Sequence, residues 1–582
     1  MQRFEIWAPL AKSMSVQVGG ESIPMRGPDA GWWRVQVDSA GPGADYAFLI
    51  DQDRTAYPDP RSQWQPNGVH AHSRIYDQAA FRWADQRFQA LPLASAIIYE
   101  LHVGTFTPEG TLDSAIGKLE YLRDLGITHV ELMPLASFAG KYGWGYDGAS
   151  LFAVHEPYGG PDGLKRFVDA AHNRGLAVLL DVVYNHFGPA GNYTGKFGPY
   201  LTEAHKTPWG GAVDLEEAGS QQVRRFFCDN ALMWLRDLHL DGLRIDAVHA
   251  FIDRSAIHFL EQLAMETETL GAALGRQFVL IAESDLNDPR IVTSRDCGGY
   301  GMHAQWSDDF HHALTTVLSR KKLTGYYTDF GSVAQLAKAL EKTFVFDGIF
   351  SHYRRRVHGR PLGGLSQHRF LGFIQNHDQV GNRAIGDRIT EIAGVDRAKI
   401  AAALVLLGPF VPLLFEGEEW AASSPFQYFA DHDDPELARQ VSEGRKREFA
   451  AFGWDPASIP DPEKKETFLR SKLKWGELEE PVHAEMLAWY RKLIQLRRST
   501  PCLNDGEPGN TTVRFSEEQR WICMKRGSIL VACNIASGAR TLPIAADSEL
   551  MLASKPDVVL EDCAIKLAPD SVAILRVDTR SS

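Results

Sequence analysis

The chain has 582 residues, of which 44% are hydrophobic and 23% are charged. This is the composition of a globular protein with a large core, and it excludes a disordered chain. Its 61 basic and 74 acidic residues give a net charge of −13, which disfavours nucleic acid and anionic membrane surfaces as partners.

The N-terminal residues and the cysteines bear on the cellular compartment that we expect for the protein. Residues 1–20 contain no apolar run after a basic segment, so we expect no signal peptide. The sequence has six cysteines without any C-x-x-C pair, which argues against a zinc or redox motif and suits a reducing compartment. We therefore expect a cytoplasmic protein, and its oligomeric state cannot be inferred.

Residues 1–90 are predicted to form an N-terminal β-sandwich. Short runs alternate apolar and polar residues, as in Trp33, Val35 and Val37, and Gly and Pro residues separate these runs. A period of two with frequent turns is typical of antiparallel sheets. The expected domain is immunoglobulin-like, of the kind found in carbohydrate-binding modules.

Residues 91–500 show apolar, strand-like runs that alternate with amphipathic helical segments. Repeated β–α units predict parallel strands, and eight of them predict a closed (β/α)8 TIM barrel with insertions, the catalytic domain. Residues 501–582 return to a period of two and are predicted to form a C-terminal antiparallel β-domain. The eight predicted barrel strands are Ile97–Val103, His129–Leu135, Ala177–Val183, Gly242–Val248, Phe278–Glu283, Met302–Trp306, Leu371–Gln375 and Val411–Phe415.

Four of the predicted strands end in ionisable residues. The C-terminal strand ends of a (β/α)8 barrel form the face that carries catalytic residues. Here these ends read DVVYNH (181–186), DGLRID (241–246), AESD (282–285) and QNHDQ (375–379). Buried charges cost free energy unless they are paired, so we interpret the four ends as one shared polar site rather than as separate structural ion pairs.

Clustered carboxylates favour the cleavage of glycosidic bonds. That reaction needs one carboxylate as nucleophile or base and one carboxylic acid as proton donor. The segment Phe138–Asp147 follows the second strand and adds four aromatic rings, each of which could stack on a sugar or simply pack locally. No His and Cys set has metal-ligand spacing, so we expect no metal and no cofactor, and a divalent ion held by Asp, Glu and His is a weaker alternative.

The four strand-end motifs, in this order, are similar to the signature regions of the α-amylase superfamily, glycoside hydrolase family 13. The resemblance extends to the layout of sandwich, barrel and C-terminal β-domain. It implies that Asp246 is the nucleophile, Glu283 the general acid/base and Asp378 the carboxylate that binds the distorted sugar, and it makes Asp181 largely structural. It also implies that Tyr146, His186, Arg244 and His377 surround the sugar in the cleavage subsite. The further predicted substrate-binding residues are Asp147, Gln379, Trp306 and Asp308.

Elementary electrostatics agrees with these implied roles. Arg244 lies on the same strand face as Asp246 and should keep that carboxylate ionised, as a nucleophile requires. Glu283 must stay protonated, so burial and negative neighbours should raise its pKa. Retention of anomeric configuration implies a separation of roughly 5–5.5 Å between the carboxyl groups of Asp246 and Glu283.

Further segments are similar to those of family members that act on maltooligosyltrehalose. They include residues 298–313 and Leu414–Trp420. This resemblance implies hydrolysis of the α-1,4 bond next to the terminal trehalose unit of maltooligosyltrehalose, with related α-glucans as further partners. Selectivity would then depend on the leaving-group side of the site. The candidate residues there are Trp306, Asp308, Asp309, His311 and Glu418, although the aspartate pair could instead cap a helix.

Three alternatives are open from the sequence. A branching or debranching enzyme would share the sandwich and the barrel, and branched products would identify it. A fold can also persist without catalysis, so a non-catalytic glucan-binding protein is the alternative from another class. A metal-dependent hydrolase is the third, and loss of activity with a chelator would favour it.

Overall fold

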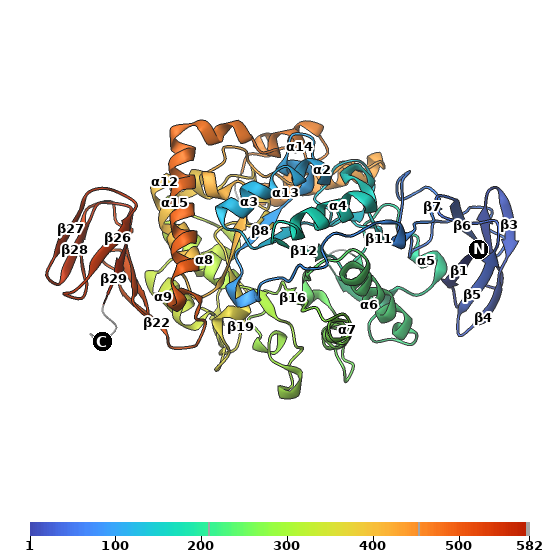
Figure 1. The fold of residues 1–582 in the computed structure, drawn as a ribbon, viewed down its shortest axis with the longest axis horizontal. Helices are drawn as coiled ribbons and strands as arrows, with labels where there is room; N and C mark the ends of the chain where they lie inside the picture. Colours follow the sequence, from blue (N-terminus) through green and yellow to red (C-terminus); the bar gives the residue numbers. More distant parts are fainter. Residues whose placement is uncertain (208–209, 452–453, 578–582) are drawn as a thin grey trace.

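The computed structural model describes residues 1–207, 210–451 and 454–577. Figure 1 shows sheets at either end of the long axis, with a barrel and its helices between them. The N-terminal sheets are drawn in blue and the C-terminal sheets in red. This arrangement follows the order of the three regions in the chain.

The N-terminal region consists of two antiparallel sheets with an apolar layer between them. One sheet has the order β1-β5-β4 and the other β3-β2-β6-β7. Phe4 and Tyr46, from different sheets, have ring centroids 4.9 Å apart. The predicted N-terminal β-structure is therefore confirmed. The bounds are β1 (Gln2–Trp7), β2 (Met14–Val18), β3 (Glu21–Pro24), β4 (Arg26–Asp29), β5 (Trp32–Val37), β6 (Asp45–Ile50) and β7 (Ser73–Arg74).

Eight parallel strands close into a barrel in the order β12-β15-β16-β17-β20-β21-β8-β9, and β9 pairs back with β12. The prediction of a closed (β/α)8 barrel is confirmed, and each predicted run overlaps one of these strands, although β20 begins one residue before its run. All of them except β21 are shorter than predicted, and in β15, β16 and β20 the polar residues Asp246, Glu283 and Gln375 lie beyond the end of the strand. The barrel strands are β8 (Ile98–Leu101), β9 (His129–Leu132), β12 (Ala177–Val182), β15 (Gly242–Ile245), β16 (Val279–Ala282), β17 (Ala304–Trp306), β20 (Phe370–Gly372) and β21 (Val411–Phe415).

Amphipathic helices cover the outside of the barrel. In α4 (Gly160–His172), the residues with helical spacing, such as Leu164, Phe167 and Val168, are buried against the strands. The helix α3 (Leu119–Leu125) ends at Gly126, which adopts a left-handed conformation with φ 103° and donates to the carbonyls of the last turn. Further helices are α6 (Ser220–Asp237), α7 (Phe259–Leu274), α8 (Asp308–Leu318), α12 (Val395–Leu406), α13 (Pro435–Ala451) and α15 (Pro481–Ser499).

The C-terminal region has a sheet of order β22-β23-β24-β29-β26 and a second of order β25-β28-β27, all antiparallel. The buried Arg526 attaches it to the barrel by donating to the carbonyls of Leu407 and Gly408. The strands are β22 (Thr511–Ser516), β23 (Trp521–Arg526), β24 (Ile529–Asn534), β25 (Arg540–Pro543), β26 (Glu549–Ala553), β27 (Val558–Glu561), β28 (Ala564–Leu567) and β29 (Ser571–Arg576).

Two findings bear on the environment of the protein. Within the described parts of the chain, no helix combines the length and the apolar character needed to cross a membrane. The six cysteines all lie in those parts and are free thiols, three of them buried.

Candidate active site

Arg244 is the centre of the charged groups at the C-terminal ends of the strands. It lies on β15 beside Asp181 of β12, and its side chain is fully buried. Its Nη1 atom donates to Asp181 Oδ2 over 2.7 Å and to Asp246 Oδ1 over 2.9 Å. Its Nη2 atom lies 3.1 Å from Glu283 Oε2. One guanidinium therefore holds carboxylates from three neighbouring strands.

Asp246 is held by two donors. Besides Arg244, the amide Nδ2 of Asn185 donates to Asp246 Oδ2 over 2.8 Å. The predicted contact between Arg244 and Asp246 is present. Both contacts fix the orientation of the Asp246 carboxylate, which positions it to act as a nucleophile.

Glu283 lies in an environment that favours its protonated form. Burial raises its pKa well above the usual range, and the carboxylates of Asp246 and Asp378 act in the same direction, against Arg244. Its Oε2 accepts from the backbone N–H of Ala247 over 2.7 Å. The side chain is still 16% exposed, so a protonated Glu283 can reach a ligand.

The fourth strand end positions His377 and Asp378 at the start of α10 (His377–Gly381). The Oδ1 atom of Asn376 accepts from the Gln379 N–H over 2.8 Å, which caps this helix. His377 Nδ1 lies 2.5 Å from Glu100 Oε1 on β8. Burial opposes the charged imidazolium, but the carboxylates of Asp378 and Glu100 outweigh it and raise the pKa of His377 to about 9.

Asp378 is partly exposed, and each of its oxygens has a neighbour. Its Oδ2 atom lies 3.5 Å from His377 Nε2, and its Oδ1 atom accepts from Asn382 Nδ2 over 3.0 Å. The carboxylate is therefore oriented at the surface of the site.

Tyr146 is the aromatic residue of the loop after β9 that enters the charged cluster. Its hydroxyl donates to Asp181 Oδ2 and lies 2.7 Å from His377 Nε2, while its ring stacks on the imidazole with centroids 5.0 Å apart. His186 Nε2 lies 3.0 Å from the Tyr146 carbonyl oxygen. Local packing accounts for two other rings of this loop, because Phe138 stacks on His155 and Tyr142 stacks on Phe468.

The three predicted catalytic carboxyl groups face one cavity of about 560 Å³. Its walls come from the loops after several barrel strands and from α13. The lining residues are Trp144, Tyr146, Asp147, His186, Asp246, Ala247, His249, Glu283, Asp378, Asn382, Tyr428, Val441, Arg445 and Glu448.

Three of the eight predicted substrate-binding residues, Tyr146, Asp147 and His186, line this cavity. Arg244 and His377 are buried behind it, and Asp308 lines a second cavity.

Trp306 and Gln379 also lie outside the lining. Trp306 is only 1% exposed, and its ring lies under Arg244, 4.1 Å from the guanidinium carbon. It therefore supports Arg244 and does not face the open cavity. Gln379 points elsewhere, since its Oε1 accepts from Tyr327 Oη over 3.0 Å.

A second, narrow cavity lies close to Glu283, because the charge of Asp308, which lines it, acts on that carboxyl group. Asp308 and Asp285 line it together with Tyr326, Tyr353 and Arg354. Burial, reinforced by the carboxylate of Asp285, raises the pKa of Asp308 to about 8. Of the leaving-group candidates, Asp308 and Asp309 both line this cavity, and the charge of Asp308 acts on Glu283.

Asp309 and the remaining leaving-group candidates have structural contacts. Asp309 Oδ2 accepts from Asn287 Nδ2 and from the backbone N–H groups of Val345 and Phe346, which fixes the loop before them. His311 Nε2 lies 2.9 Å from Tyr327 Oη, and Glu418 Oε1 accepts from Tyr490 Oη over 2.9 Å. All three candidates are buried.

Sequence reasoning missed Glu100, Asn185, Asn382 and α13. Glu100 stands inside an apolar first strand, where a carboxylate without a partner would be costly, and that conflict was the available signal. Asn185 belongs to a motif that was identified, but its contact with Asp246 depends on how two strands lie together. The residues of α13 carry no local signal, because their helix follows the last barrel strand after a long loop.

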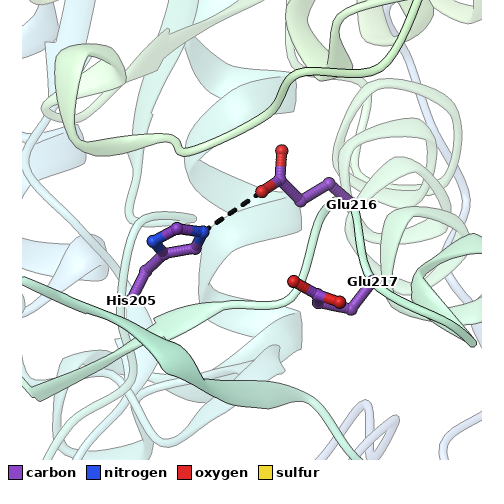
Figure 2. A group of neighbouring side chains, drawn as sticks. All are labelled: His205, Glu216 and Glu217. Carbon is purple, nitrogen blue, oxygen red and sulfur yellow. Dashed lines mark hydrogen bonds and ion pairs between the residues drawn. The ribbon is translucent and has the colours of Figure 1, made fainter.

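One group of side chains in the described parts of the chain has ligand atoms within 4.8 Å of one another, namely His205, Glu216 and Glu217 (Figure 2). His205 Nε2 lies 3.2 Å from Glu216 Oε1. Arg254 also binds Glu216, through its Nε at 2.9 Å and its backbone N–H at 2.6 Å. Because the Arg254 guanidinium already neutralises the Glu216 carboxylate, the group is better described as a cluster of ion pairs than as a metal centre.

Comparison with known proteins assigns the chain to a family. Residues 62–204 match the alpha amylase catalytic domain, and residues 508–574 match a domain of unknown function, DUF3459. Malto-oligosyltrehalose trehalohydrolases from Rhizobium sp. strain M-11 and Mycobacterium tuberculosis strain H37Rv are 48% and 47% identical to it. The matches cover 99% of this chain and 97% and 99% of those proteins. The chain belongs to the malto-oligosyltrehalose trehalohydrolase family.

A solved structure agrees with the family. The crystal structure of a putative alpha amylase from Salmonella typhimurium is 36% identical and superposes with a TM-score of 0.91, covering 99% of this chain and 97% of that one. The match includes the N-terminal sheets, the barrel and the C-terminal sheets. The layout of this trehalohydrolase-family chain is thus shared over its length.

Proposed function

We propose that the protein hydrolyses the α-1,4 bond next to the terminal trehalose unit of maltooligosyltrehalose, with retention of configuration, and releases trehalose. The observation that carries the proposal is that Arg244 contacts both Asp246 and Glu283 at one cavity, while burial raises the pKa of Glu283 well above the usual range. Retaining glycosidases require two such neighbouring carboxyl groups, one acting as the nucleophile and the other, protonated, as the acid. The similarity to named trehalohydrolases supports the choice of substrate.

In the first step, Asp246 attacks the anomeric carbon while Glu283 donates its proton to the glycosidic oxygen. The C–O bond to trehalose breaks and a glycosyl ester forms on Asp246. In the second step, Glu283 takes a proton from water, which attacks the same carbon and frees Asp246. Arg244 and Asn185 hold Asp246 throughout, so little reorganisation is needed as its charge changes.

The remaining groups bind the sugar whose bond is cut. Asp378 presents a carboxylate to its hydroxyls, and His377, with a pKa of about 9, is a cationic donor at neutral pH. Tyr146 and His186 line the same cavity and complete this subsite. Hydrogen bonds to the sugar hydroxyls that strengthen as the sugar ring distorts would lower the activation free energy of the hydrolysis.

Trehalose, as the leaving group, would bind in the part of the site that Glu283 faces. The general acid must contact the leaving-group oxygen, and Asp308, which lines the second cavity, is near enough for its charge to act on Glu283. Groups that bond to the hydroxyls of trehalose would be left unpaired by an ordinary reducing end, which gives selectivity.

One variant and one product analysis test the chemistry. Asp246→Asn should abolish turnover, and the wild type should yield a product whose new reducing end is the α-anomer in NMR spectra taken within seconds to minutes of mixing. A β-anomer would contradict the retaining mechanism, and new α-1,6 branches would indicate a branching enzyme of the same superfamily.

The proposal extends to partners and location. Maltooligosyltrehalose and related α-glucans are the proposed partners, and the six free thiols support a reducing compartment such as the cytoplasm. Cell fractionation with an antibody against the chain tests this location.

A further inference from the structure

The helix α13 forms part of the wall of the catalytic cavity. It follows β21, the last strand of the barrel, and its residues Val441, Arg445 and Glu448 line the same cavity as Asp246 and Asp378. Glu448 is exposed there and interacts electrostatically with Arg445 on the preceding turn. The family's strand-end motifs do not include this helix.

Contacts to α10 and to aromatic residues of the cavity fix the position of α13. Arg445 Nη2 donates to the carbonyl of Gly381 over 2.6 Å, at the end of the helix that begins with His377. The guanidinium also lies over the ring of Tyr428, 5.0 Å from its centroid. The edge of Tyr428 in turn contacts Trp144, with centroids 5.2 Å apart. The helix α13 is therefore bound to the end of α10, the helix that carries Asp378, and to the aromatic side of the cavity.

The polarity of the site shows which part of a substrate meets this wall. Glu283, as the proton donor, faces the leaving group, and the carboxylate of Asp308 is close enough to raise its pKa. No described residue of α13 lines the second cavity, whereas α13 shares the catalytic cavity with Tyr146 and His186, the residues proposed to bind the cut sugar. A glucan chain that continues beyond the cut sugar on its non-reducing side would thus pass α13.

We propose that Glu448, Arg445 and Tyr428 form a subsite for the glucosyl units on the non-reducing side of the cut bond. The inference rests on the proposed function and adds to it the residues on which a preference for longer glucans depends. A carboxylate, a guanidinium and a phenol at one wall are suited to the hydroxyl groups of a sugar, and the neighbouring rings supply apolar contact. A longer glucan gains these contacts, whereas a substrate with one glucosyl unit does not reach them.

The test compares substrates of different length. For the wild type and Glu448→Ala, kcat/KM is measured with glucosyltrehalose and with maltotetraosyltrehalose. The proposal expects the ratio of long to short substrate to fall about tenfold in Glu448→Ala, the loss typical of a hydrogen bond to a charged group. Tyr428→Phe, which keeps the ring and removes the hydroxyl, should lower the ratio by a smaller factor.

A matched control lies on the same helix. Glu443 forms ion pairs with Arg439 and Arg447 and does not line the cavity, so Glu443→Ala should leave the ratio within about twofold of the wild type. An unchanged ratio in Glu448→Ala, or an equal change in Glu443→Ala, would overturn the subsite.

A binding measurement separates this inference from the proposed reaction. In the Asp246→Asn background, calorimetry with maltooligosaccharides of increasing length should show affinity rising with length, and Glu448→Ala should flatten that rise. If the wild type released no trehalose but this dependence on Glu448 appeared, the subsite would stand and the proposed reaction would fail. Equal affinities with and without Glu448→Ala would overturn the subsite whatever the reaction.

Discussion

At the scale of single residues, the site depends on how one buried cation distributes its contacts. Arg244 is fully buried and contacts Asp181, Asp246 and Glu283, while Trp306 covers its face. A buried charge of this kind is tolerable only with such partners. A lysine could not replace it, because a point charge cannot serve three carboxylates in a planar fork.

The raised pKa of Glu283 predicts a specific pH dependence. Burial favours the protonated acid, so kcat/KM should fall as the pH rises through this raised pKa. Glu283→Gln should lose more than about a hundredfold in rate with glycosides but much less with a glycosyl fluoride, whose leaving group needs no proton. Steady-state kinetics over a range of pH check both effects, and an unaltered alkaline limb in Glu283→Gln would contradict the assignment.

The pair of His377 and Glu100 predicts a stability that depends on pH. The pKa of His377 is raised to about 9 in the folded protein, against about 6.5 in an unfolded chain. Its contribution to stability is therefore fully present below pH 6.5 and is lost as the pH rises towards 9. Relative to Glu100→Gln, the wild type should lose on the order of 2 kcal/mol over this range in urea unfolding. A parallel pH dependence of the two proteins would contradict the pairing, and the exposed Glu120→Gln serves as control.

At the scale of elements, strand ends and short helices deliver the side chains. Asp181 and Arg244 are neighbours in the ladder of β12 and β15, and His377 begins α10. The eight strands could be predicted because apolar runs with period-breaking polar ends are a local property of the sequence. The contacts of Asn382 and α13 could not, since they depend on loops whose path is set by packing.

The helix α10 tolerates no added side-chain atom at Gly381. A Cβ there would lie 2.0 Å from the buried ring of Trp144, and backbone and indole would both have to move. Gly381→Ala should therefore displace Asp378 and lower kcat/KM at least tenfold, with a lower melting temperature. Gly195→Ala is the control, because a Cβ there meets nothing within 4 Å. Wild-type kinetics in Gly381→Ala would show that α10 does not constrain the site.

At the scale of the whole molecule, the barrel is held between β-domains at either end (Figure 1). The order of the three regions could be predicted from the change between periods of two and helical periods. The boundaries at residues 90 and 500 remain predictions, because composition changes gradually there. The docking of the C-terminal sheets was not predictable, since the carbonyls that Arg526 binds lie far from it in the chain.

The contact of Arg526 predicts how firmly the C-terminal region is attached. Its guanidinium donates to the carbonyls of Leu407, Gly408 and Leu503, and a methionine would leave these buried acceptors unpaired. Arg526→Met should lower the free energy of unfolding by about 3 kcal/mol while kcat/KM at low temperature is retained. The exposed Arg514→Met should change neither quantity. An unfolding midpoint in urea equal to that of the wild type would refute this role.

The central claim is that the site cleaves next to trehalose, and a competition between two substrates tests it most directly. Equal concentrations of a maltooligosyltrehalose and of the maltooligosaccharide of matching length are given to the wild type, with Asp246→Asn as the blank. The account predicts rapid release of trehalose from the first and slow attack on the second. Equal rates on both substrates, or branched products, would contradict it.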